Sequence, residues 1–220
     1  MAAAKALSGE AEALPGVIPV FPLPGALLLP RAYLPLHIFE PRYLAMVRDA
    51  MKNGKYIGMV QPHGLQDDGR PRLFSVGCLG RISQFEETKD GRFLISLKGI
   101  SRFRIASELQ VDTPYRQVEA DYTLYADDRI PPAPLPSVLR AQLLDQLGQY
   151  LEARTLKADW DSIHGADDEM LVSAICMLCP FTEAEKQALL EAASLTERAE
   201  AAILLMRFAG EDTGSTDARH

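Results

Sequence analysis

Two cysteines stand at the spacing of redox and zinc motifs. Cys176 and Cys179 bracket the sequence CMLC. A redox role requires a thiol with a low pKa, and a zinc site requires two further ligands. Cys78 lies in the other half of the chain, and one nearby histidine, His164, does not complete a site. The motif falls late in an apolar stretch with helical periodicity, so we interpret both thiols as core residues and expect neither metal nor cofactor.

The sequence contains no other convincing set of catalytic side chains. His37 lies in a strand-like run, where a lone histidine is more often a hydrogen-bonded structural residue than a catalyst. The Gly54-Lys55 pair is not a phosphate-binding loop, because no glycine precedes it by five positions and a tyrosine follows it. No carboxylate pair, Ser/His/Asp set or Cys/His pair has supporting context. We therefore predict that the chain is not an enzyme.

Five arginines on strand-like segments allow two interpretations. They could form a basic face for RNA or acidic peptides, or a solvated sheet face balanced by neighbouring acidic residues. No aromatic residues interleave with them to form a stacking platform, which favours the solvated face. These residues are Arg81, Arg92, Arg102, Arg104 and Arg116.

The better binding candidate is the apolar stretch at residues 26–43, ALLLPRAYLPLHIFEPRY. It holds more large apolar side chains than one face of short strands can bury, and exposed apolar patches often mark interaction sites. Polar and aromatic residues at the start of the following helix could rim such a patch. The alternative is that all of these side chains pack inside the fold. The candidate peptide- or protein-binding residues are Leu28, Leu29, Tyr33, Phe39, Glu40, Arg42 and Tyr43.

Short strands and one helix are predicted for the first half of the chain. Residues 1–15 read as a disordered tail, and alternating or apolar runs then predict six to eight strands across residues 16–125. Strand candidates include Leu27–Leu29, and a helix is expected to open at Glu40-Pro41 and to end at Asn53-Gly54. Residues 62–72 are expected to form a loop.

The second half has the periodicity of helices. A proline-rich linker at 126–136 leads to a four-helix region at 137–209 and a disordered tail at 210–220. Ser137, Asp167 or Asp168, and Thr182 are the expected helix caps, the last within a Thr-x-x-Glu capping box. The fold class is α+β, with strands and helices segregated along the chain.

Charge and cysteine content limit the function classes. The net charge of −7 divides into +2 for residues 1–125 and −9 for residues 126–220, so the chain lacks the basic field of a non-specific nucleic-acid binder. Three cysteines do not make a disulfide framework and indicate a reducing compartment. No apolar run is long enough for a signal peptide or a membrane span. We expect a cytoplasmic protein.

The order of several segments resembles the N-terminal substrate-binding domain of the Lon ATP-dependent protease family. The resemblance extends over residues 16–209 and is strongest for bacterial chains that consist of that domain alone. It rests on IPVFPL at 18–23, PLHIF at 35–39, MVQ at 59–61, VGCLGRI at 76–82, LKGISRFRI at 97–105 and PFTEAEKQALLE at 180–191.

The resemblance implies a PUA-like pseudo β-barrel followed by helices, and a binding role. We expect the chain to act without the ATPase and Ser-Lys peptidase domains of the full-length proteases. We expect a non-enzymatic protein- or peptide-binding module, a regulator or adaptor in protein quality control, that acts as a monomer or weak dimer. Its expected partners are unfolded or specific client proteins and a protease or chaperone. The alternative, RNA binding through the PUA-like barrel, is disfavoured by the acidic charge.

Overall fold

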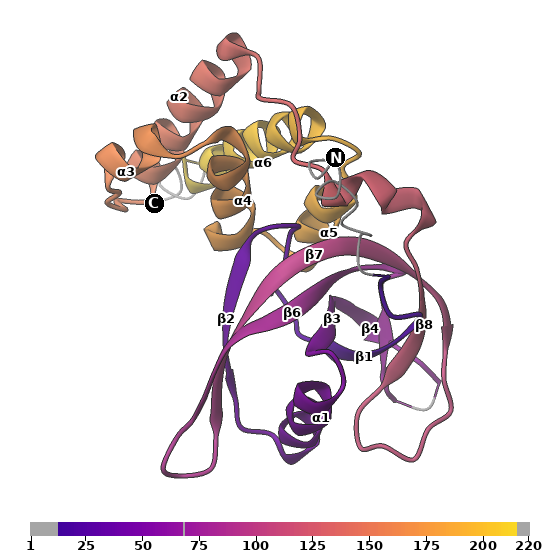
Figure 1. Cartoon of the computed structure of the whole chain (residues 1–220). Helices are drawn as coiled ribbons and strands as arrows, with labels where there is room; N and C mark the ends of the chain where they lie inside the picture. The colour runs from indigo at the N-terminus through magenta and orange to yellow at the C-terminus, as the bar shows by residue number, and fades with distance from the viewer. Residues whose placement is uncertain (1–12, 68, 215–220) are drawn as a thin grey trace, which may run out of the picture.

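The computed structural model describes residues 13–67 and 69–214 and shows a β-rich half followed by a helical half (Figure 1). The strands are β1 (Val17–Pro22), β2 (Tyr33–Ile38), β3 (Tyr56–Val60), β4 (Pro62–Leu65), β5 (Pro71–Leu73), β6 (Val76–Glu87), β7 (Phe93–Glu108) and β8 (Gln117–Asp121). The helices are α1 (Pro41–Lys52), the 3-10 helix η1 (Thr123–Arg129), α2 (Ser137–Ala153), α3 (Trp160–Gly165), α4 (Asp168–Leu178), α5 (Glu183–Glu191) and α6 (Leu195–Gly214).

The main sheet closes into a ring. Its strand order is β2-β7-β6-β3-β1-β8, and β8 also pairs with β7, so β7, β6, β3, β1 and β8 form a barrel with β2 outside it. The β1–β3 pair is parallel and the other pairs are antiparallel. The expected α+β class and pseudo-barrel are confirmed. Helices α2–α6 gather at one end of the barrel and α1 lies at the other (Figure 1).

Three local predictions in the β-rich half are wrong. The segments 93–97 and 101–105, which the sequence predicts as two separate strands, form one long strand, β7. Its pairing has register shifts opposite β6 and β8, and it pairs with three strands: β2, β6 and β8. Residues 62–72 are not a plain loop, because β4 and β5 pair within them. Leu27–Leu29 is not a strand; it is an irregular segment whose side chains are buried.

Gly99 explains how that irregular segment is held. It pairs with the backbone just after Leu29, because Arg31 N donates to Gly99 O at 2.8 Å and Gly99 N donates to Ala32 O at 2.8 Å. A Cβ at position 99 would lie 2.0 Å from the carbonyl oxygen of Leu29. The absence of a side chain therefore lets residues 29–32 lie directly on β7.

Local sequence signals set most helix ends. Glu40 is the N-cap of α1 with Pro41 at the first helical position, as expected. Asp167 caps α4 by accepting a hydrogen bond from Met170 N at 2.7 Å. The capping box of α5 is present in both directions between Thr182 and Glu185. Ser137, by contrast, is the first residue of α2 and makes no cap, since Pro136 takes the N-cap position.

The helical half differs in extent from the prediction. Trp160 begins the short helix α3, which Asp159 caps, so in the described part of the chain five α-helices rather than four follow η1. The predicted linker begins inside η1, and Leu135 N donates to Asp168 at 2.7 Å. Helix α6 runs to Gly214, into the predicted C-terminal tail. Residues 1–12 and 215–220 of the two predicted tails lie outside the described residues.

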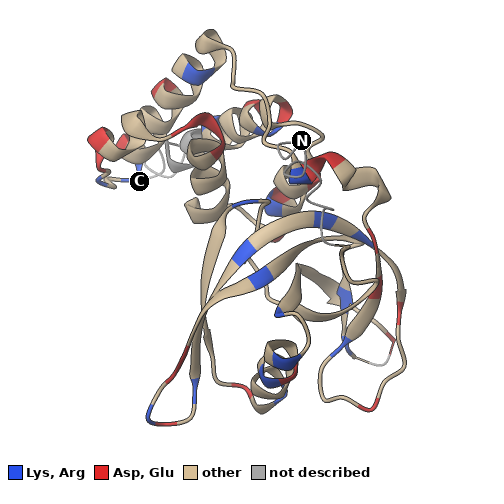
Figure 2. Cartoon of the chain, in the orientation of Figure 1, with Lys and Arg blue, Asp and Glu red and all other residues tan. Residues whose placement is uncertain are grey.

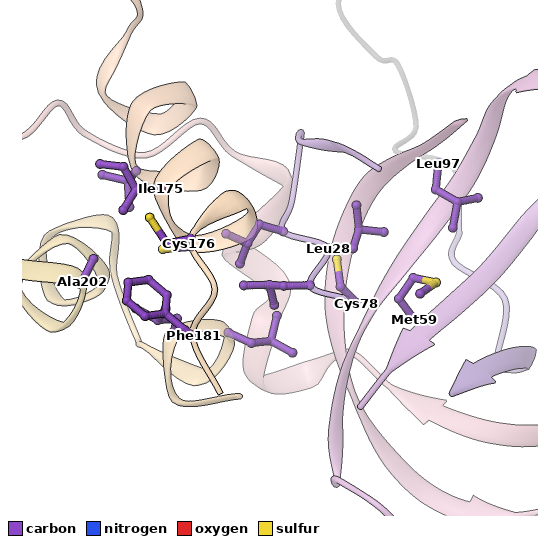
Figure 3. Close-up of a cluster of buried hydrophobic side chains, with 14 of the residues drawn as sticks. Leu28, Met59, Cys78, Leu97, Ile175, Cys176, Phe181 and Ala202 are labelled. Atoms are coloured by element: carbon purple, nitrogen blue, oxygen red, sulfur yellow. The ribbon is translucent and has the colours of Figure 1, made fainter. Parts of the chain in front are cut away.

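The two halves share a core. One cluster of buried apolar side chains includes Leu27–Leu29, α1 residues and barrel residues such as Cys78 and Leu97. From the helical half it includes Ile175 and Cys176 of α4 and Phe181, which lies between α4 and α5. Figure 3 shows Leu28 and Cys78 facing the helical side chains across the junction. A second, smaller cluster around Ile18 and Phe103 lies inside the barrel. The leucine-rich stretch near the N-terminus therefore joins the barrel to the helices.

Buried polar bonds also join the halves. Arg102 on β7 pairs with Asp128 of η1 at 2.7 Å and donates to the carbonyl oxygens of Leu190 and Ala192. Lys186 of α5 donates to Gly25 O at 2.7 Å. These bonds satisfy charges that burial would otherwise destabilise, and they fix the angle between helices and barrel. No helix among the described residues is long and apolar enough to cross a membrane.

Candidate functional site

The structure places six of the seven predicted binding residues in the core or on two separate surfaces, and Phe39 lines neither surface. Leu28 and Leu29 are buried in the shared core. They therefore pack inside the fold, which was the alternative interpretation, and cannot belong to a surface binding site. Tyr33 and Phe39 are 56% and 59% exposed. Glu40, Arg42 and Tyr43 lie at the start of α1.

The first surface is a cleft of about 460 Å³ at the α1 end of the barrel, which we call the barrel cleft. Glu40, Arg42 and Tyr43 line it together with the end of β1 and the β7–β8 connection. Phe21 and Tyr43 stack with ring centroids 4.1 Å apart, and the Arg42 guanidinium lies 4.5 Å from the Tyr43 ring centroid. The cleft thus has an aromatic floor beneath an arginine.

Charged and phenolic groups at the barrel cleft are paired. Arg116 binds Glu108 through two hydrogen bonds of 2.7 and 2.5 Å. The Tyr115 hydroxyl donates to Asp49 at 2.8 Å. Burial, reinforced by Asp49, raises the pKa of Tyr115 to about 12, and burial also raises the pKa of Tyr43. Phenols with raised pKa values stay protonated at neutral pH, so they supply hydrogen bonds and apolar surface but not a general base.

The second surface is a groove of about 360 Å³ between the start of β2 and helix α4, which we call the α4 groove. Tyr33 lines its barrel side, and Met170, Ala174, Met177 and Leu178 line its helical side. Met170 is 60% exposed and Leu178 is 82% exposed. A helix normally buries such side chains, so this groove presents apolar surface to solvent.

The sequence of α4 explains why the groove is apolar. One stripe of the helix is buried in the shared core: Leu171, Val172, Ile175 and Cys176. The groove residues at 170, 174, 177 and 178 repeat at i, i+4, i+7 and i+8, so they form a second stripe on the same helix. A helix that is apolar around its whole circumference is normally buried on all sides. The second stripe of α4 is the one left uncovered.

An ion pair closes one end of the α4 groove. Arg31 donates to both carboxylate oxygens of Glu169, with Nε bonds of 2.9 and 2.8 Å. Arg31 also donates to Asp128 O through Nη1. Its backbone has φ of 64°, a value uncommon for a residue other than glycine, which turns the chain from the buried leucines into β2. The hydrogen bonds to Glu169 raise the pKa of Arg31, so the guanidinium stays charged.

The two surfaces cannot act as one site. Tyr33 opens β2 at the α4 groove, whereas Glu40 follows the end of β2 at the barrel cleft, roughly 20 Å away at the rise of a β-strand. A groove does lie between the barrel and the helices, but Glu40 and Arg42 do not line it. Sequence reasoning missed Met170, Met177 and Leu178. The signal that could have found them is the run MLVSAICML, in which Ser173 is the single polar residue.

The other candidate side chains do not gather into a site. All three cysteines are free and buried, and burial raises the pKa of Cys176 to about 12 and that of Cys179 to about 11. High pKa values are the opposite of what a reactive thiol requires. His37 is exposed on β2. Within the described residues, no group of three or more His, Cys, Asp or Glu side chains is arranged to hold a metal ion.

The five strand arginines do not share one basic face. Arg102 is buried in its ion pair, Arg116 is bound to Glu108, and Arg92 pairs with Asp90 at 3.1 Å in the turn after β6. Arg81 lies over the Tyr56 ring at 5.5 Å, and Arg104 is exposed further along β7. The interpretation of a balanced, solvated sheet surface suits Arg92 and Arg116, while Arg102 is structural.

Comparison with known proteins identifies the fold and the family. The model of the ATP-dependent protease La (LON) substrate-binding domain matches residues 17–207. The chain belongs to this family. The Lon N-terminal domain protein of Xanthomonas campestris superposes with a TM-score of 0.59 at 24% identity, over 84% of this chain and 95% of that one. The N-terminal domain of Lon protease from the Mycobacterium avium complex gives 0.61 at 20% identity, over 87% and 98%.

Curated relatives of this Lon substrate-binding domain are much longer. "Lon protease 2" of Myxococcus xanthus is 28% identical over 112 residues, which is 50% of this chain and 13% of that protein. "Lon protease" of Parabacteroides distasonis is 27% identical over 201 residues, 86% of this chain and 23% of that protein. The match therefore concerns the substrate-binding part of these proteases.

Proposed function

We propose that this chain is a non-catalytic protein-binding module that takes apolar side chains of client proteins into the α4 groove. Membership of the Lon substrate-binding domain family supports a role in substrate recognition. One observation carries the choice of site: α4 is apolar on both faces, and its outer face is exposed beside Tyr33. The proposal includes a cytoplasmic location and a role as regulator or adaptor in protein quality control.

The chemistry of the groove suits clients of varied sequence. Met170 and Met177 supply flexible thioether side chains, which adapt to differently shaped apolar partners and recur at promiscuous binding surfaces. The Tyr33 ring adds a rigid wall on the opposite side, and the Lys98 ammonium lies 5.8 Å from its centroid. The shared core and the Arg31–Glu169 pair hold both walls in place. Binding would then require little rearrangement of the module.

The test is binding of a permanently unfolded protein, reduced and carboxymethylated, measured by fluorescence anisotropy. The variant Met170→Ser/Leu178→Ser removes apolar side chains from the groove without touching the core. Each lost side chain removes about 1 kcal/mol or more of burial, so we expect affinity to fall at least about tenfold. Leu65→Ser on β4 is the matched control, because Leu65 is 64% exposed and lies outside the groove.

A parallel variant separates the two surfaces. Arg42→Ala alters the barrel cleft and leaves the α4 groove intact. We expect it to bind the unfolded protein like the unaltered chain. Loss of binding in Arg42→Ala, with retention in Met170→Ser/Leu178→Ser, would move the client site to the barrel cleft. No binding by the unaltered chain would refute the proposed function.

A further inference from the structure

We propose that the α4 groove selects client segments in which Lys or Arg residues flank the apolar side chains; this rests on the proposed function and names its substrate class. The groove has an acidic end. Asp167 and Glu169 line it at the start of α4, and Arg31 neutralises Glu169. Asp167 is exposed and has no cationic partner among residues 13–67 and 69–214. Its carboxylate accepts the capping hydrogen bond from Met170 N at 2.7 Å and keeps its negative charge exposed, where it attracts a cation of the client.

The helical half around the groove also has a negative net charge. Residues 126–214 hold 7 Lys and Arg against 16 Asp and Glu, a charge of −9. Among the cations, Lys186 and Arg198 are buried, and Arg140 is bound to Asp168 at 2.5 Å. Figure 2 shows acidic residues along the helices and Lys and Arg on the barrel strands. Such a field raises the local concentration and association rate of cationic partners.

Two cations of the barrel side lie near this field. Arg31 lines the groove and is paired with Glu169, and the Lys98 ammonium lies 5.8 Å from the centroid of the Tyr33 ring. The groove is acidic at the start of α4 and, apart from Ser173, apolar along the rest of the helix to Leu178, whose exposed side chain ends the stripe. A matching segment places apolar side chains on the stripe and its cationic residue beside Asp167.

The size of the hollow favours a segment of chain over a second copy of the domain. A volume of about 360 Å³ takes a few side chains. A stable dimer normally buries about 800 Å² on each partner, which requires a broad complementary face. The occupant we infer is therefore an extended or helical segment of a client, apolar and cationic.

Two fluorescent peptides test the inference with the intact chain. Both carry the same apolar residues, flanked by Lys in one and by Glu in the other. At about 50 mM salt we expect the Lys-flanked peptide to bind about tenfold more tightly, and at about 1 M salt we expect this ratio to fall below threefold, because salt screens exposed charges. Asp167→Asn keeps a capping side chain and removes the charge, so it should lower the ratio.

Asp145→Asn is the matched control, since Asp145 is exposed on α2 and does not line the groove. It should preserve the peptide preference. Equal binding of the two peptides would overturn this inference and leave the proposed function standing. Binding of neither peptide would count against the proposed function itself. A dimer that Met170→Ser/Leu178→Ser converts to monomer would also overturn the inference, by assigning the groove to a second copy.

Discussion

Asp128→Ala should weaken the junction that positions the α4 groove. The Asp128 carboxylate accepts hydrogen bonds from Arg102 at the backbone N (2.8 Å), Nε (2.9 Å) and Nη2 (2.7 Å). Both side chains are buried. Removing the carboxylate leaves the Arg102 guanidinium buried with carbonyl acceptors only. Arg198 lies nearby and adds to the destabilisation. Burial and repulsion from Arg102 already lower the pKa of Arg198, and the Asp128 carboxylate offsets that repulsion until it is removed.

The expected loss is about 3–5 kcal/mol in the free energy of unfolding, the usual cost of stranding one partner of a buried ion pair. A domain of this size loses about 2–4 °C of melting temperature for each kcal/mol, so we expect a fall of roughly 6–20 °C. Urea titration followed by far-UV circular dichroism measures the free energy of unfolding directly.

Two further variants make this prediction specific. Asp127→Ala removes an exposed neighbouring carboxylate and should change stability by no more than about 0.5 kcal/mol. Arg102→Met/Asp128→Leu replaces the whole pair with apolar side chains and should recover most of the loss, since neither partner then remains buried as an unpaired charge. A loss under about 1 kcal/mol in Asp128→Ala would refute the argument that this pair compensates buried charge.

Three other changes test separate parts of the fold. Gly99→Ala should lower the free energy of unfolding by about 3 kcal/mol or more, because the new Cβ would clash with the backbone of Leu29. Urea titration would measure this loss. Thr182→Ala should lower the free energy of unfolding by about 1 kcal/mol, because it removes the cap of α5. A fall in melting temperature of less than about 1 °C would contradict this. Cys176 and Cys179 should resist iodoacetamide at pH 8 until urea unfolds the chain. Because burial raises both folded pKa values to about 12 and about 11, stability should fall as pH rises above the ordinary thiol value of 9.0.

The sequence by itself determined the features that depend on neighbouring residues. The capping box at Thr182, the cap at Asp167 and the Glu40-Pro41 helix start are short-range patterns, because their hydrogen bonds close within one turn. Alternation and helical periodicity likewise gave the segregated α+β order. The run of family-like segments covered residues 16–209, close to the matched range of 17–207.

Only the tertiary structure decided which side chains are exposed. The leucines before Arg31 look like a binding patch in sequence, but the fold places them between barrel and helices, where Gly99 lets their backbone approach. The outer face of α4 looks like core in sequence, yet no described element covers it. Burial depends on contacts between segments far apart along the chain, which periodicity does not specify. For the same reason, Tyr33 and Arg42, close in sequence, belong to different surfaces.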